Sequence, residues 1–76
     1  MKMQKMLLLG GTGFIGREVV RVAVDAGWQV AALSRSEAGD VLLRGLGATP
    51  VRGDAAEPLG WVEEARGAAV MIDLVQ

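Results

Sequence analysis

The chain contains no cysteine, histidine or tyrosine. The lack of cysteine excludes disulfides and thiol chemistry, and without histidine as well the ligands that zinc prefers are missing, so we expect no metal site. No apolar run approaches the ~18 residues that suggest a membrane span, and no signal peptide is evident. We therefore expect a cytoplasmic protein with no membrane partner. A formal net charge of −1 also argues against a nucleic-acid partner.

Glycine, by contrast, is abundant, and its most informative use is the stretch LLLGGTGFIG, residues 7–16. An apolar run ends at Gly10, Gly13 and Gly16, and an amphipathic pattern begins at once. Gly10 permits a sharp exit from a strand, Gly13 lets a pyrophosphate approach the main chain, and Gly16 lets the next helix lie close to the strand. The free N–H groups and the dipole at the start of that helix favour an anion.

This pattern predicts a turn that binds a diphosphate through backbone N–H groups. The residues expected to line it are Gly10, Gly11, Thr12, Gly13, Phe14, Ile15 and Gly16, with the N–H groups of Thr12, Phe14 and Ile15 as donors. The alternative is a glycine-rich turn that binds nothing. A P-loop fits poorly, because Arg17 and Glu18 stand where that motif has lysine and a hydroxyl residue.

Apolar segments alternate with helical patterns along the whole chain. We expect strands over 5–9, 28–33, 49–52 and 69–75, and helices over 14–26, 40–46 and 58–66. This alternation predicts one α/β domain over residues 1–76, with a parallel sheet in the order 3-2-1-4 and the first strand central. Pro50 suits an edge strand, because proline cannot donate to the ladder.

The expected helices and edges also carry packing predictions. In the first helix we expect Ile15, Val19, Val22 and Ala26 to form the inward apolar stripe. Trp28 and Trp61 are expected to pack rather than to bind a ligand. The apolar fourth strand lies at an edge of the expected sheet, which predicts self-association as a dimer or swapped form.

The GGTGFIG turn after an apolar strand resembles that of the short-chain dehydrogenase/reductase superfamily. It is most similar to the extended and atypical branches, which include nucleotide-sugar epimerases, dehydratases and NmrA-like proteins. The resemblance covers nearly the whole chain. It implies the first half of a Rossmann fold, a partial fold that binds the adenosine–pyrophosphate part of NAD(P).

The chemistry of that superfamily needs a tyrosine and a lysine four positions later. The chain has no tyrosine, and its only lysines, Lys2 and Lys5, precede the glycine turn. We therefore expect no catalytic residue here, and a truncated half-domain of a reductase-like or epimerase-like parent. The alternative is an NmrA-like dinucleotide sensor that performs no catalysis.

The resemblance also implies which residues meet the adenosine. The end of the second strand faces the adenosine ribose, where an acid would select NAD. This chain has Ser34 and Arg35 there, and an arginine fork can bind a 2′-phosphate, so we favour NADP(H) over NAD(H). Arg35 as a solvated turn residue, or nearby Glu37 as an NAD-type acid, are the alternatives.

Two further acids lie at strand ends. The Gly53-Asp54 pair resembles the G-D-x-x-D segment of the family, which implies that Asp54 and Ala55 hold the adenine edge. Glu57 replaces the later aspartate of that segment, and Asp54 could instead turn the chain or cap a helix. Asp73 could meet a ribose hydroxyl or point into solvent, and the sequence leaves both open.

Overall fold

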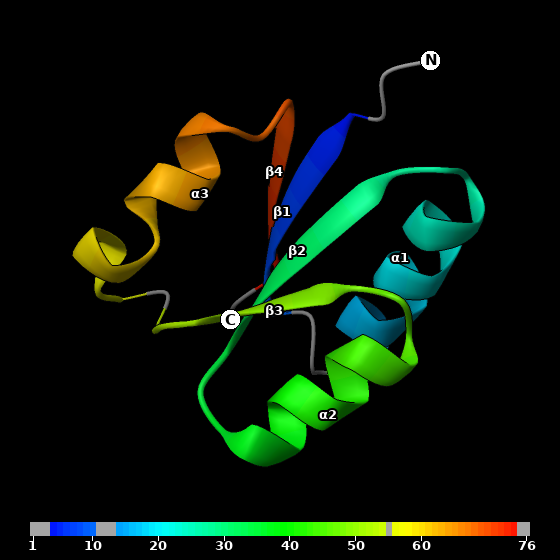
Figure 1. Cartoon of the computed structure of the whole chain (residues 1–76), viewed down its shortest axis with the longest axis horizontal. Coiled ribbons are helices and arrows are strands. Elements are labelled where there is room, and N and C mark those ends of the chain that lie inside the picture. The colour runs from blue at the N-terminus through cyan, green and yellow to red at the C-terminus, as the bar shows by residue number, and fades with distance from the viewer. Residues whose placement is uncertain (1–3, 11–13, 55, 75–76) are drawn as a thin grey trace.

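The computed structural model describes residues 4–10, 14–54 and 56–74. Its strands are β1 (Lys5–Leu9), β2 (Gln29–Ser34), β3 (Thr49–Arg52) and β4 (Val70–Asp73). All neighbours pair in parallel, and the sheet order is β3-β2-β1-β4 (Figure 1). The predicted α/β architecture and strand order are confirmed, with Pro50 in the edge strand β3.

Helices cover both faces of this sheet. The α1 helix (Phe14–Asp25) and α2 helix (Glu37–Gly45) lie on one face, while the short 3₁₀ turn η1 (Pro58–Gly60) and α3 (Val62–Arg66) lie on the other (Figure 1). In the described part of the chain, no helix is long and apolar enough to cross a bilayer.

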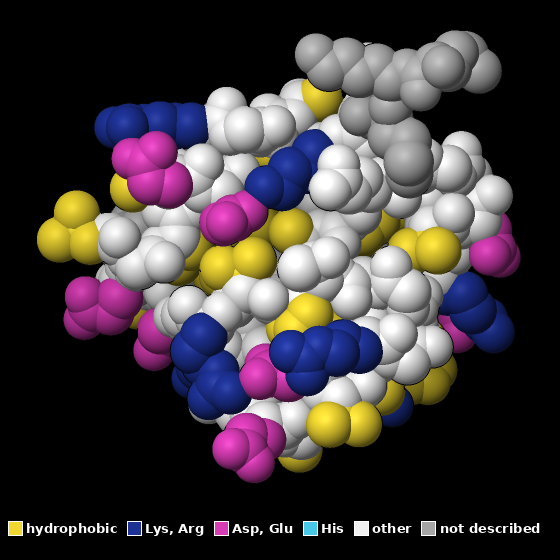
Figure 2. Space-filling view, in the orientation of Figure 1, with side chains coloured by type: hydrophobic (Ala, Val, Ile, Leu, Met, Phe, Trp, Pro, Cys, Tyr) yellow, Lys and Arg dark blue, Asp and Glu magenta, His cyan; other side chains and the backbone are white. Residues whose placement is uncertain are grey.

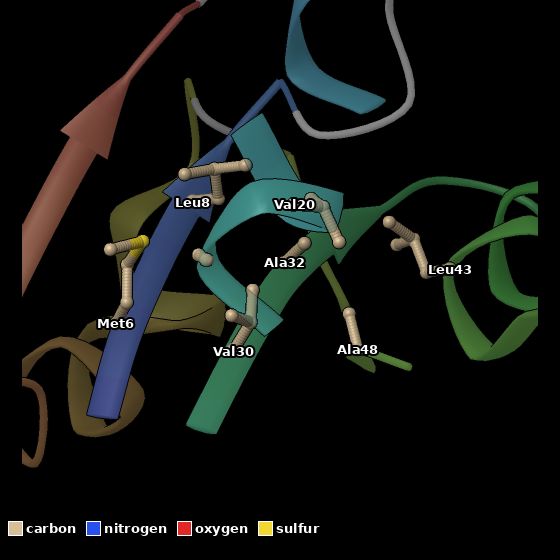
Figure 3. Packing of buried hydrophobic residues seen from close by; sticks show 8 residues of the cluster. Met6, Leu8, Val20, Val30, Ala32, Leu43 and Ala48 are labelled. Atoms are coloured by element: carbon tan, nitrogen blue, oxygen red, sulfur yellow. The ribbon is translucent and has the colours of Figure 1, made fainter. Parts of the chain in front are cut away.

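The central strand β1 is buried on both faces, which explains its unbroken run of apolar residues. Met6 and Leu8 point toward the α1 and α2 side, and Leu7 and Leu9 point toward α3. Figure 3 shows the first of these clusters, in which β1 and β2 side chains meet Val20 of α1. The members of this cluster are Met6, Leu8, Val20, Ala23, Val30, Ala32, Leu43 and Ala48.

The inward face of α1 differs from the predicted one. Its buried residues are Gly16, Val20 and Ala23. Of the predicted stripe, Val19 is partly buried against the core cluster, whereas Ile15 and Val22 are 62% and 64% exposed and Ala26 is exposed as well. Two adjacent apolar stripes share the helical period, and the sequence pattern does not choose between them. The stripe with the smaller residues lies on the sheet. The other stripe lines an open groove of about 400 Å³ with Met6 and Trp28.

The second helix begins earlier than predicted. It starts at Glu37 rather than residue 40, because the Ser36 hydroxyl caps it by accepting a 3.1 Å hydrogen bond from the backbone N–H of Gly39. A serine at this position satisfies one of the free donors of the first turn. The helix ends at Gly45, and the chain turns at Gly47 with a φ of +91°.

The third predicted helix, 58–66, is divided into η1 and α3 at Trp61. This residue has φ −138° and ψ 4°, outside helical geometry, and its side chain is buried against the α3 side of the sheet. Burial of the large ring outweighs the short stretch of helix that is lost. The other differences are small: helix 14–26 ends at 25, strand 28–33 spans 29–34, and strand 69–75 spans 70–73.

Candidate functional site

The carboxyl ends of all four strands meet at one edge of the sheet, because the strands are parallel. The strands are followed there by Gly10 after β1, Arg35 after β2, Gly53 after β3 and Leu74 after β4. Figure 1 shows these ends converging below the labels of β1 and β2. Ligands of open parallel sheets bind outside such an edge, so we regard it as the candidate site.

Gly10 makes the turn out of β1. Its φ of +95° lies in the left-handed region that disfavours a side chain. An added Cβ would also lie 3.2 Å from the carbonyl carbon of Leu74, whose own N–H donates a 2.8 Å hydrogen bond to Leu9. The glycine therefore keeps the backbones after β1 and β4 close together.

The remainder of the predicted diphosphate turn is described only in part. Gly11, Thr12 and Gly13 lie outside the described residues. Phe14 and Ile15 open α1 as exposed residues, and Gly16 is buried in the first turn of that helix. The role predicted for Gly16, close contact between helix and strand, stays a prediction.

The β2–α2 turn holds the two residues predicted to meet the ribose. Ser34 is buried, and its hydroxyl donates a 2.8 Å hydrogen bond to the backbone oxygen of Ser36. Ser34 therefore holds the backbone of the β2–α2 turn through this hydrogen bond. Arg35 is exposed, and its Nη1 atom lies 4.0 Å from Oδ2 of Asp54.

A groove of about 590 Å³, with both polar and apolar lining residues, opens at the start of α2. It is lined by Arg35, Ser36, Ala38, Gly39 and Leu42. The guanidinium of Arg35 and the positive end of the α2 dipole both favour an anion at this place. Glu37 is exposed but does not line the groove.

The Gly53-Asp54 loop lies beside Arg35. The N–H of Gly53 donates a 3.0 Å hydrogen bond to Ser34 O, which ties the loop to the end of β2. Asp54 Oδ1 accepts a 3.0 Å hydrogen bond from the N–H of Ala56, so this carboxylate does shape its own turn, as one alternative predicted. Its other oxygen faces Arg35, and Ala55 lies outside the described residues.

Sequence reasoning missed the contribution of Trp61 to this loop. The indole N–H donates a 2.9 Å hydrogen bond to the backbone oxygen of Asp54. Trp61 was expected to pack, and it does. Its hydrogen bond, however, joins residues seven positions apart in the chain. Periodicity carries no signal of such a contact.

An ion pair joins α2 to β3 near the same edge. Arg52 Nη2 donates a 2.7 Å hydrogen bond to Oδ2 of Asp40, whose side chain is only 16% exposed. The Ser34 hydroxyl, and next the Arg52 guanidinium, lower the pKa of Asp40 below its ordinary value of 3.8, against the effect of burial. The pair holds the first turn of α2 against β3.

Other charged residues give weaker signals. Asp73 ends β4 opposite Leu9 and is exposed. Among the described residues, no group of three or more histidines, cysteines or acids could hold a metal ion. Figure 2 shows basic and acidic side chains intermingled on the visible face rather than gathered by sign.

Comparison with known proteins decides the family. The model of the NmrA-like family matches residues 2–76. The chain belongs to the NmrA-like family. The similarity first inferred from the glycine turn is thereby confirmed.

Two curated relatives of this NmrA-like chain differ in their named roles. One is a decarboxylating sterol-4-alpha-carboxylate 3-dehydrogenase from Dictyostelium discoideum, 36% identical over 92% of this chain and 21% of that protein. The other is the photosystem II assembly factor Ycf39 from Cyanophora paradoxa, 37% identical over 90% of this chain and 21% of that protein. The chain thus spans about a fifth of the length of these relatives.

A solved structure supports the same fold. AtPrR2 with NADP⁺ and (+)-pinoresinol superposes with a TM-score of 0.81 at 25% identity, over 100% of this chain and 27% of that one. That neighbour contains an NADP⁺ cofactor. The carboxyl edge of this sheet can therefore be compared with the same edge of a protein that binds NADP⁺.

Proposed function

We propose that this NmrA-like chain binds the adenosine–pyrophosphate part of a nicotinamide dinucleotide, and that it prefers NADP(H) to NAD(H). The observation that carries the preference is Arg35, which lines the groove at the end of β2 while Glu37 does not. An exposed guanidinium can take a 2′-phosphate bidentately, whereas an acid at this place would favour the free ribose hydroxyl.

The geometry of the edge supports the remaining contacts that we propose. The diphosphate would lie over the turn that begins at Gly10 and against the start of α1, where Phe14 and Ile15 present their first-turn N–H groups. Asp54, beside Arg35, and Ala55 would meet the adenine edge, as the family resemblance implies.

A neighbour and the chemistry of the groove support this assignment. AtPrR2 carries NADP⁺ and shares the fold over the whole of this chain. The groove beside Arg35 has a volume of about 590 Å³, within the range of small-molecule sites. Ser34 would act through the shape of the turn, since its hydroxyl is bonded to Ser36.

Titration of the purified chain with NADPH and NADH tests the proposal. A ligand of the native state at a hundred times its dissociation constant stabilises by about 2.7 kcal/mol. For a domain of this size that corresponds to a rise in melting temperature of roughly 10 °C or more. We expect this rise with NADPH at concentrations where NADH gives little. An equal or larger response to NADH would overturn the preference, and no response to either would overturn dinucleotide binding.

The relatives allow two roles for a protein that contains this segment, an enzyme or a non-catalytic sensor. One relative is named a dehydrogenase and the other an assembly factor. We infer that this segment supplies cofactor binding in either case. It has no tyrosine, so it does not itself supply the catalytic acid of the superfamily. A coding sequence that continues past residue 76 with Tyr-x-x-x-Lys would favour the enzyme.

We also propose that the isolated chain self-associates through β4. Val70 and Met71 of this edge strand are 37% and 51% exposed. An apolar edge with unpaired backbone groups tends to pair with another chain. The groove beside Ile15 and Val22 offers further apolar surface to a second copy. Sedimentation at increasing concentration tests this, and a single monomer boundary throughout would refute it.

A further inference from the structure

We propose that Trp61 is a positioning residue for adenine, which it serves by fixing the Gly53-Asp54 loop at the carboxyl edge. The inference rests on the proposed dinucleotide function and assigns a residue to its adenine end. Trp61 lies between η1 and α3, and it does not line the groove beside Arg35. Its effect on a ligand would pass through the backbone of the loop.

The indole fixes the loop by a hydrogen bond and by contact. Its N–H donates to the backbone oxygen of Asp54 at 2.9 Å, and the same oxygen accepts a 2.9 Å hydrogen bond from the N–H of Glu57. A Cβ added to Gly53 would lie 3.4 Å from Cδ1 of Trp61 and 3.6 Å from Cδ2 of Leu33. Gly53 therefore passes between the ring and the end of β2, and an added methyl group would touch both at ordinary van der Waals distance.

The loop is also held from the opposite side. Gly53 donates a 3.0 Å hydrogen bond to Ser34 O, and Asp54 Oδ2 faces Arg35 at 4.0 Å. A line of contacts thus runs from Trp61 through Asp54 to the guanidinium proposed to hold the 2′-phosphate. A shift of the Asp54 backbone would misplace the carboxylate relative to an adenine amino group.

The backbone at Trp61 interrupts the helix. A continuous helix over 58–66 would leave residue 61 in helical geometry, but Trp61 has φ −138° and interrupts it. Its side chain is 8% exposed and packs with Leu7, Leu9, Ala31 and Leu33. Packing alone would require only an apolar ring. The indole N–H adds a directional contact to the loop, and a phenylalanine would lack it.

The test compares Trp61→Phe with Trp28→Phe as the matched control. Trp28 packs beside α1, with the other core cluster. Each protein is titrated with NADP⁺ and with nicotinamide hypoxanthine dinucleotide phosphate, in which a carbonyl replaces the adenine amino group. We expect the wild type and Trp28→Phe to prefer NADP⁺. We expect Trp61→Phe to bind NADP⁺ about 3- to 10-fold more weakly, as loss of one hydrogen bond implies.

The hypoxanthine analogue separates positioning from simple stability. Its affinity should be unchanged in Trp61→Phe, so the preference for adenine shrinks while binding of the rest of the dinucleotide persists. Equal loss of affinity for both dinucleotides, or no loss for either, would overturn the role of Trp61 and leave the proposed function intact. Flat titrations with all three proteins, wild type included, would instead remove the proposed function and this inference with it.

A second measurement covers the case in which Trp61→Phe does not fold. Trp28→Phe leaves Trp61 as the sole tryptophan, so its fluorescence reports on the loop. We expect 2′,5′-ADP to change this emission in a saturable way, and ribose 5-phosphate, which lacks adenine, to leave it unchanged. If Trp61 emission ignores 2′,5′-ADP while the ligand still raises the melting temperature, the inference is wrong.

Discussion

Gly10 lies so close to Leu74 that a Cβ added to the glycine would approach the leucine carbonyl carbon to 3.2 Å. These residues follow the central strand β1 and the edge strand β4. Their separation sets how near Gly10, where the predicted diphosphate turn begins, lies to the end of β4. The positive φ of Gly10 disfavours any other residue for a second reason, because a residue with a Cβ is strained in this backbone conformation even where there is room for the side chain.

Gly10→Ala should therefore lower the free energy of unfolding by about 1–3 kcal/mol, from backbone strain and crowding together. Urea denaturation followed by circular dichroism measures this loss. NADPH should also bind more weakly to the folded variant, because the turn backbone is displaced.

Gly45→Ala is the matched control for this change. Gly45 ends α2 with no positive φ, and nothing lies within 4 Å of an added Cβ. Alanine is the better helix former, so this variant should be as stable as the wild type or more stable by up to about 1 kcal/mol. A Gly10→Ala protein as stable as Gly45→Ala would contradict the geometry of the turn.

Arg35→Gln tests the phosphate contact. Hydrogen bonds to charged groups contribute about 1.5–3 kcal/mol, so affinity for NADPH should fall roughly 10- to 100-fold. Affinity for NADH should change little, because it has no 2′-phosphate. Isothermal titration calorimetry measures both.

Arg66→Gln removes the same charge from α3, where Arg66 pairs with Glu63. This control should leave both affinities near those of the wild type. If the two variants lose NADPH affinity equally, Arg35 acts only through the overall charge.

Asp40→Asn tests the ion pair with Arg52. The folded pKa of Asp40 lies below its ordinary value of 3.8, so the fold favours the ionised form. The resulting stability is fully present above about pH 4–5 and is lost as the pH falls through the folded pKa. The stability gap between wild type and variant should narrow as the pH drops from 6 toward 3, as urea midpoints at each pH will show.

Asp25→Asn, in the last turn of α1, serves as its comparison. A surface substitution of this kind changes stability by no more than about 0.5 kcal/mol. If the difference in stability between the wild type and Asp40→Asn stays constant with pH, ionisation of the Asp40 carboxylate makes no net contribution to stability.

Met71→Lys tests self-association through β4. A charge on an edge strand opposes pairing with another chain, so the dissociation constant of a dimer should rise by at least about tenfold. Analytical ultracentrifugation over a concentration series measures it. Val41→Lys places the same charge on α2, where Val41 is 68% exposed, and should leave association unchanged. Equal effects of both variants would point to general charge repulsion.

Several features of this chain followed from local sequence. The glycine spacing from Gly10 to Gly16 identified the βα turn and its family, because backbone geometry limits which residues can stand there. The unbroken apolar run of β1 indicated a strand covered on both faces. Alternating strands and helices, with right-handed crossovers, limited the layout, and the order expected within that limit, β3-β2-β1-β4, is confirmed. The cofactor residues, the NADP(H) preference and the cytoplasmic location remain predictions.

Tertiary structure alone decided what depends on distant partners. The sheet selected the stripe of Gly16, Val20 and Ala23 over its apolar neighbour on α1, because small residues allow close packing. It also placed Trp61 beneath Asp54, and Asp40 against Arg52. These contacts join residues that no period or spacing relates, so they arise only when the strands are brought together.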